Sequence, residues 1–163
     1  MDKAQKQLVD TYFRKRDIAM RESLEYELRI WELTYMADHG MIKPGMALHL
    51  DDSQTAAILM RSPQAAPALT EYINDLNYNS MLSMEVIVRH PELIKYFELE
   101  RLDYDDMVTI IIKHPELLSY FDKFINDIAG YYGVESIIKH HPNLRKYFED
   151  RLHRKFDKVV TEQ

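Results

Sequence analysis

The chain has 163 residues, of which 46% are apolar, enough for one domain with a hydrophobic core. It contains no cysteine, which excludes disulfides and cysteine-ligated metal sites. The net charge of −6 argues against a nucleic-acid-binding domain, because such domains are usually basic. No segment has the apolar length of a membrane span, and residues 1–17 lack the apolar core of a signal peptide. We therefore expect a cytoplasmic protein, in a cell or in an infected host cell.

Residues 4–38 contain no proline or glycine and repeat apolar side chains in steps of three and four. This spacing predicts a helix about 50 Å long that ends before Gly40. It could break at residues 14–17, where four charged residues run together. We expect residues 1–40 to be a cap lying along the domain or an arm that reaches for a partner. Because the helix is amphipathic and carries Trp31, it could also pair with a second copy to form a homodimer.

The next helix is predicted from the residues at its N-terminal end. Asp51, followed by Asp52 and Ser53, is typical of an N-cap and predicts a helix over residues 53–61. The stretch from 39 to 50, which precedes it, is the nearest thing to a linker in the chain.

An internal repeat then dominates the sequence. Pro67, Pro91, Pro115 and Pro142 follow one another in steps of 24, 24 and 27 residues, and each has a leucine two positions on and a tyrosine five positions on. A more degenerate copy could begin at Pro44. Such regular spacing predicts stacked structural units. In the last three copies the proline follows a histidine, namely His90, His114 and His141.

Each His-Pro pair predicts a corner between two helices. Proline ends the preceding helix and is well suited to the first position of the next one. A Tyr-Phe pair follows each of these corners at residues 96–97, 120–121 and 147–148, and we assign all three pairs to the core. The aliphatic runs before the corners could be strands, but they are too short to alternate in hydropathy.

These elements predict an all-α fold in a single domain, residues 1–163. We expect a long N-terminal helix packed on a short right-handed solenoid of helix–turn–helix repeats, with about four degenerate copies over residues 51–160. The segments Val88-Arg89-His90-Pro91 and Ile112-Lys113-His114-Pro115 resemble leucine-rich variant repeats and, more distantly, HEAT repeats. The resemblance spans residues 55–150 and departs from that family in its aromatic pairs. It implies an architecture and transfers no functional residue.

The repeated histidines raise the question of a metal site. A ladder of imidazoles about 10 Å apart cannot converge on one ion, so we predict that each caps a backbone N–H at its corner. Asp150 and His153 could share an ion with His140 and His141, but the Glu-x-x-His pattern of helical di-iron sites is absent. No catalytic motif occurs either. We therefore expect no cofactor, no metal and no catalytic residue, although a small metal-binding or enzymatic protein remains an alternative.

Two surfaces are candidates for a macromolecular partner. Residues 91–128 carry nine acidic and four basic residues, whereas residues 136–163 carry seven basic and four acidic ones. Tyrosine and arginine are common interface anchors, so a protein partner should contact the acidic stretch and the tyrosines that follow it. Those predicted partner-binding residues are Glu98, Glu100, Arg101, Asp103, Tyr104, Asp105, Asp106, Tyr131 and Tyr132.

The alternative is a nucleic-acid-associated regulatory protein, since phosphate binding depends on clustered basic charge. Its predicted contacts are Arg145, Lys146, Arg151, Arg154 and Lys155. Repeat arrays offer long, shallow surfaces that usually bind proteins. The sequence therefore favours a non-catalytic interaction protein: an adaptor, an assembly factor or an inhibitor of another protein.

Overall fold

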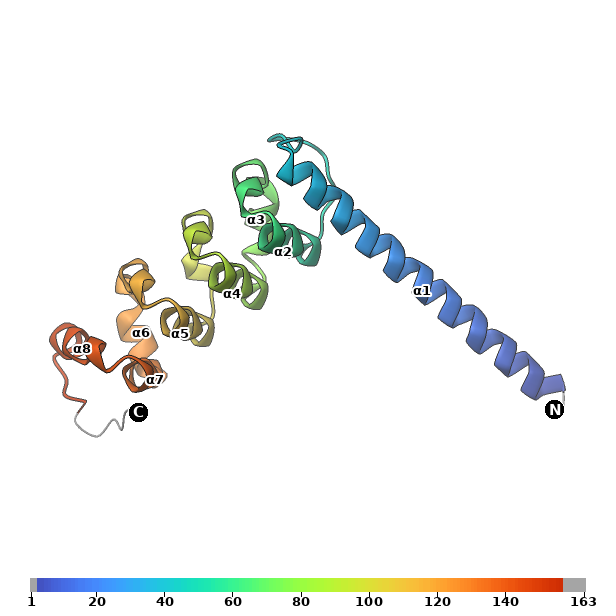
Figure 1. Ribbon diagram of the computed structural model, residues 1–163. Coiled ribbons are helices and arrows are strands. Elements are labelled where there is room, and N and C mark those ends of the chain that lie inside the picture. The colour runs from blue at the N-terminus through green and yellow to red at the C-terminus, as the bar shows by residue number, and fades with distance from the viewer. Residues whose placement is uncertain (1–2, 157–163) are drawn as a thin grey trace.

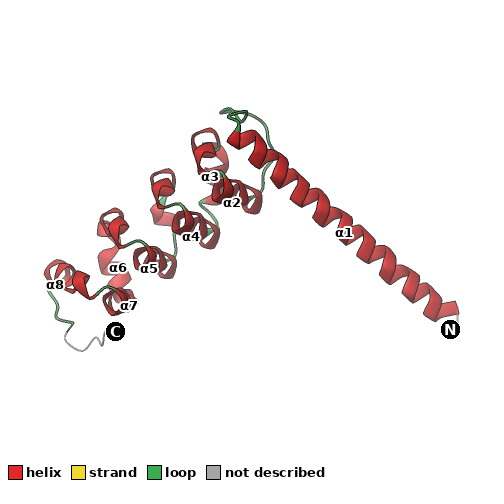
Figure 2. Cartoon of the chain, in the orientation of Figure 1, coloured by secondary structure: helices red, strands yellow, loops and turns green. Residues whose placement is uncertain are grey.

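The computed structural model describes residues 3–156. Every regular element in this part of the chain is a helix, which confirms the all-α class (Figure 2). The long helix α1 (Lys3–Asp38) projects from one end of a row of shorter helices (Figure 1). It runs without interruption through residues 14–17, where the sequence had suggested a break. None of the helices within residues 3–156 has the length and hydropathy needed to cross a membrane.

The shorter helices form four consecutive units. In each unit an α-helix is followed by a corner and then by 3₁₀ or short helical segments, which return along it. The leading helices α2, α4, α5 and α7 contact one another in chain order (Figure 1). The bounds are α2 (Asp52–Arg61), η1 (Pro63–Ala68) and α3 (Thr70–Leu76); α4 (Ser80–Arg89), η2 (Pro91–Tyr96) and η3 (Leu99–Arg101); α5 (Tyr104–Lys113), η4 (Pro115–Phe124) and α6 (Ile125–Gly130); α7 (Gly133–His140), η5 (Pro142–Leu144) and α8 (Arg145–Leu152).

The corner of the first unit is at Ser62-Pro63, which corrects the proposed alignment on Pro67. Ser62 has φ −136° and ψ 71°, close to the −135° and 78° of His90. Pro67 lies inside η1 instead of starting it. Pro44 also begins no helix, because residues 41–51 are irregular. Pro63 ends α2 for the expected reason, since it has no N–H for the helical hydrogen bond.

The segments after the corners are 3₁₀-helices, where the sequence had suggested α-helices. In a 3₁₀-helix residues three apart lie on one face, so Leu118 and Phe121 of η4 point together into the core. Tyr120 is exposed, although Leu117, three residues before it, is buried. The assignment of all three Tyr-Phe pairs to the core is therefore wrong for Tyr120. Tyr96 and Tyr147 are partly buried, and the three phenylalanines are buried.

The core follows the leading helices. Each leading helix contributes two adjacent aliphatic residues that are completely buried. They stand four and three positions before the corner residue of that unit. Burying one such side chain contributes about 1.5–3 kcal/mol. Helix α1 joins the same core through Ile30, Leu33 and Ala37 near its C-terminal end. The four pairs are Ile58 and Leu59, Val86 and Ile87, Ile110 and Ile111, and Ile137 and Ile138.

The start of the first unit follows from its cap. The Asp51 carboxylate accepts a hydrogen bond from the Gln54 backbone N–H at 2.7 Å, and the Gln54 side chain accepts one from the Asp51 N–H at 3.1 Å. This reciprocal capping box confirms the predicted N-cap and explains why α2 begins at Asp52.

Candidate functional site

The four corners form one edge of the molecule, here called the corner edge and defined by residues 62–63, 90–91, 114–115 and 141–142. At the last three corners a histidine Nε2 lies within hydrogen-bonding distance of a backbone carbonyl oxygen in the preceding unit. The distances are 3.0 Å from His90 to Met60, 2.8 Å from His114 to Val88, and 2.7 Å from His141 to Ile112.

Each accepting carbonyl belongs to the second-last residue of a leading helix. Carbonyls in the last turn of a helix have no partner within it, so a neighbouring donor is needed. Because a carbonyl oxygen can only accept, each Nε2 must carry a proton. The prediction that each histidine caps a backbone N–H at its own corner is therefore wrong, because each imidazole donates to a carbonyl of the preceding unit. Their Nε2 atoms are used in joining units.

Two further contacts complete the corner edge. Ser62, which replaces histidine at the first corner, donates its hydroxyl to the Asp38 carboxylate of α1 at 2.5 Å. The Nδ1 of His114 lies 3.0 Å from the carboxylate of Glu116. The Glu116 backbone N–H, and after it His114, hold the pKa of Glu116 below its ordinary value. The side chains of Ser62 and of the three corner histidines therefore form hydrogen bonds within the molecule.

The opposite edge consists of the turns between units. We call it the turn edge and define it by residues 77–81, 98–106 and 131–132. Tyr78 and Tyr131 occupy equivalent positions, two residues before the leading helices α4 and α7, and the buried Leu102 occupies that position before α5. Tyr78 is 73% exposed and Tyr131 is 65% exposed. Tyr132, with a left-handed φ of 58°, is 78% exposed.

The aromatic side chains of the turn edge are braced by neighbouring units. The Arg101 guanidinium lies 4.0 Å from the centroid of the Tyr78 ring, and its Nε donates to the Glu98 carboxylate at 2.6 Å. That hydrogen bond raises the pKa of Arg101 above its ordinary value. Tyr104 stacks on Tyr131 with 5.1 Å between ring centroids. These contacts hold large, amphipathic side chains at the surface.

The acidic residues predicted for this site have different roles. Glu98, Asp103 and Asp105 are exposed on the turn edge. The Glu100 carboxylate pairs with Lys123, and this hydrogen bond holds the pKa of Glu100 below its ordinary value. Asp106 is partly buried and accepts the Ser80 hydroxyl at 2.5 Å, so it joins two units.

Sequence reasoning missed two exposed residues of the turn edge, Tyr78 and Met81. A signal was present, because Tyr78 stands two positions before the start of α4 and Tyr131 stands two positions before the start of α7.

Two of the basic residues near the C-terminal end, Arg154 and Lys155, form ion pairs with neighbouring carboxylates. Arg154 pairs with Glu135 and lies over the Phe156 ring at 4.8 Å from its centroid. Lys155 lies 3.1 Å from the Glu149 carboxylate. Lys146 and Arg151 are exposed on α8, where acidic residues alternate with them, and Arg145 is partly buried. Lys158, another basic residue of this segment, lies outside the described residues.

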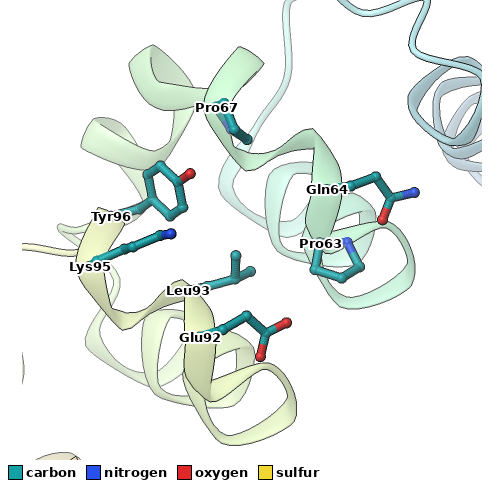
Figure 3. A pocket seen from close by; sticks show the side chains of 7 residues that line it. All are labelled: Pro63, Gln64, Pro67, Glu92, Leu93, Lys95 and Tyr96. Atoms are coloured by element: carbon teal, nitrogen blue, oxygen red, sulfur yellow. The ribbon is translucent and has the colours of Figure 1, made fainter.

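The described part of the chain contains no group of three or more metal-ligating side chains close enough to hold an ion. A groove of about 340 Å³ lies between η1 and η2, and residues of both segments line it (Figure 3). Its charged members are Glu92 and Lys95, with Leu93 and Tyr96 beside them. This lining contains no paired nucleophile and base of the kind that covalent catalysis requires.

Comparison with known proteins adds nothing to this geometry: no family model, curated protein or solved structure matches the chain.

Proposed function

We propose that this chain is a non-catalytic protein-interaction module, built as a short right-handed repeat array, that binds its partner through the turn edge. Such a module would act as an adaptor, an assembly factor or an inhibitor of another protein. The observation that carries the proposal is the presence of exposed tyrosines at two of the three turns, Tyr78 at the first and Tyr131 and Tyr132 at the third.

Side-chain chemistry supports a protein as the partner. Tyrosine and arginine contribute most often to interface binding energy, because they bury a large area and still offer hydrogen bonds. The Tyr78–Arg101 and Tyr104–Tyr131 contacts hold these groups in place before binding. Less side-chain entropy is then lost on association.

The charge of the turn edge favours a basic surface on the partner. Glu98, Asp103 and Asp105 are exposed beside the tyrosines, and Arg101 is the basic residue among them. Complementary charge speeds association and suppresses wrong partners. A nucleic acid would be repelled by the same carboxylates. The adjacent units also supply the rigid support that a shallow interface needs.

Affinity capture from a nuclease-treated native lysate tests the proposal, with three proteins compared side by side. They are the wild type, the turn-edge variant with Tyr78, Tyr131 and Tyr132 changed to serine, and the control Tyr120→Ser. Tyr120 is also an exposed tyrosine, but it lies on η4 away from the turns.

We expect one dominant protein that is recovered with the wild type and the control and lost with the turn-edge variant. Equal recovery with all three proteins would overturn the assignment to the turn edge. Recovery of nucleic acid alone, when nuclease is omitted, would favour the basic residues of α8 instead.

A further inference from the structure

Tyr132 on the turn edge has a backbone conformation that its residue type rarely adopts. Its φ of 58° and ψ of 13° are left-handed. Two other non-glycine residues in the described part of the chain have a positive φ, and both are histidines, His49 and His153. Histidine is several times more common than average in this region, whereas a bulky aromatic residue is an outlier there. The backbone of Tyr132 is therefore strained.

The side chain of Tyr132 gains nothing within the fold that would offset this strain. It is 78% exposed, and it forms no hydrogen bond and no ring contact with the other residues that the structure describes. Glycine would adopt the same backbone angles without cost. The chain does use glycine at the next position, where a Cβ on Gly133 would lie 2.5 Å from the Val108 side chain. A strained residue with an idle side chain indicates a role in binding.

The other two exposed tyrosines of the turn edge each have a ring face covered by a neighbouring unit. The Arg101 guanidinium lies 4.0 Å from the centroid of the Tyr78 ring. Tyr104 stacks on Tyr131 with 5.1 Å between ring centroids. Of the three tyrosines, Tyr132 is thus the one whose ring has both faces open to a partner, within the described residues.

The first turn also shows which group covers such a ring. Arg101 belongs to the turn that follows Tyr78, and its cationic guanidinium is attracted by the negative face of the ring. The segment that follows α8 carries an arginine too, Arg154. Its guanidinium lies over the Phe156 ring and pairs with a carboxylate of α7. The chain therefore supplies an arginine to Tyr78 and spends the later one away from Tyr132.

The charge near the third turn favours a cation as well. Asp127 on α6 and Asp105 on α5 are exposed, and the two helices contact each other. Tyr104, next to Asp105, stacks on Tyr131, which places the start of α5 at this turn. At the first turn a carboxylate accepts a hydrogen bond from the guanidinium that covers the ring. The exposed aspartates of the third turn offer the same chemistry to a cation from outside.

From these observations we infer that Tyr132 is the anchor residue of the turn edge, and that its ring binds an arginine side chain of a partner protein. The inference rests on the proposed function of the turn edge. It adds the residue on which the contact is centred and the chemical group that meets it. Because the ring serves binding and the backbone is strained, glycine at position 132 should favour folding and weaken binding.

Thermal denaturation of the full chain tests the strain without any partner. Tyr132→Gly should raise the thermal midpoint by about 2 °C, because glycine relieves the left-handed backbone. The matched control Tyr131→Gly should lower the midpoint, since Tyr131 has an ordinary φ of −103° and stacks on Tyr104. An unchanged or lower midpoint for Tyr132→Gly would show that the residue is not strained or that its ring stabilises the fold. Either result would overturn the inference.

A phage-displayed library of random peptides, selected on the immobilised full chain, tests the partner group. The enriched peptides should share an arginine. They should bind about tenfold more weakly to Tyr132→Gly and to Tyr132→Leu, which is apolar but has no aromatic face, and equally well to Tyr132→Phe. Changing the shared arginine to glutamine should weaken binding to the wild type but have little further effect on binding to Tyr132→Leu.

The outcomes separate this inference from the proposed function. Enriched peptides without arginine would overturn the inference. So would peptides that bind Tyr132→Leu as well as the wild type but lose affinity for Tyr78→Ser or Tyr131→Ser, and this result would leave the turn edge as the binding surface. Affinity that none of these substitutions changes would overturn the inference and the assignment of binding to the turn edge together.

Discussion

The corner edge and the turn edge are built from the same units and both have polar contacts between units, yet only the corners repeat one residue type for this contact. At the corners the repeated residues His90, His114 and His141 reach into the unit before and bond its carbonyls. At the turns Tyr78, Arg101 and Tyr131, which differ in type, lie at the surface.

The difference separates architecture from recognition. A residue that closes a hydrogen bond between units is needed at every corner, so its chemistry repeats. A surface residue at the turns can vary from one turn to the next, because no single hydrogen bond has to be closed at every turn. Repetition in this chain therefore marks what holds the structure together, and variation at the surface marks where specificity can reside.

The largest effect should come from the core behind the corners. Phe121 on η4 is completely buried. Phe121→Ala should lower the free energy of unfolding by about 3–5 kcal/mol, because it removes apolar contacts and leaves a cavity. Urea denaturation followed by circular dichroism measures this change. A loss well below 1 kcal/mol would show that the corner helices do not share a packed core.

The corner histidines should have a smaller but specific effect. His114→Ala leaves the Val88 carbonyl without its donor and should cost about 1–3 kcal/mol of stability. His140→Ala is the control, because its ring is exposed and lies within hydrogen-bonding distance of a carbonyl of its own helix, that of Ser136. Its cost should stay within about 0.5 kcal/mol. If urea denaturation gave equal losses of unfolding free energy for the two variants, the corner histidines would not stabilise the contact between units.

In the last unit, the stability contributed by Tyr147 should depend on alkaline pH. Burial, and then the hydrogen bond to Asp122, raises the pKa of Tyr147 to about 12. The neutral phenol is thus favoured by folding. Its contribution to stability is complete below pH 10 and is lost as pH rises through 12. Tyr147→Phe should be less stable than the wild type below pH 10, and the gap should shrink near pH 12. A gap independent of pH in urea denaturation would contradict this.

The turn edge should have the smallest effect on stability. Serine at Tyr78, Tyr131 and Tyr132 removes exposed rings, and each change should alter the free energy of unfolding by no more than about 0.5 kcal/mol. Thermal denaturation of the single variants measures this. A loss comparable to that of His114→Ala would mean that the turn tyrosines are structural and that the contrast between the edges is false.

The sequence predicted the helical class and one cap correctly. Proline has no N–H for the helical hydrogen bond, so the helix ends before Pro91, Pro115 and Pro142 could be predicted from the sequence. Asp51 was equally readable, because its cap depends on residues three positions apart.

The first corner was placed wrongly because the Leu and Tyr spacing after Pro67 imitates the other copies. The better guide was the stretch before the proline. Pro63 and Pro91 are preceded by the same pattern. It consists of an aliphatic pair, then a basic residue two positions before the proline, and a polar residue directly before it. Ser62 concealed this, since it replaces histidine while keeping the same backbone angles.

Contacts between units could not be predicted from local sequence patterns. The histidine acceptors lie 26 to 30 residues away along the chain, and only the stacking of units brings them within reach. The same holds for Arg101 over Tyr78 and for Tyr104 against Tyr131. Tyr120 was misjudged because the Leu, Tyr and Phe spacing was taken as one buried face, whereas in η4 Leu117 and Phe121 are buried and Tyr120 is exposed.

Amide hydrogen exchange of the chain, measured with and without its captured partner, tests the division between the two edges most directly. We expect added protection in residues 77–82, 101–106 and 130–133, and unchanged exchange at corner residues 90–93, 114–117 and 141–144. Protection confined to the corners or to α8, with the turns unchanged, would contradict it.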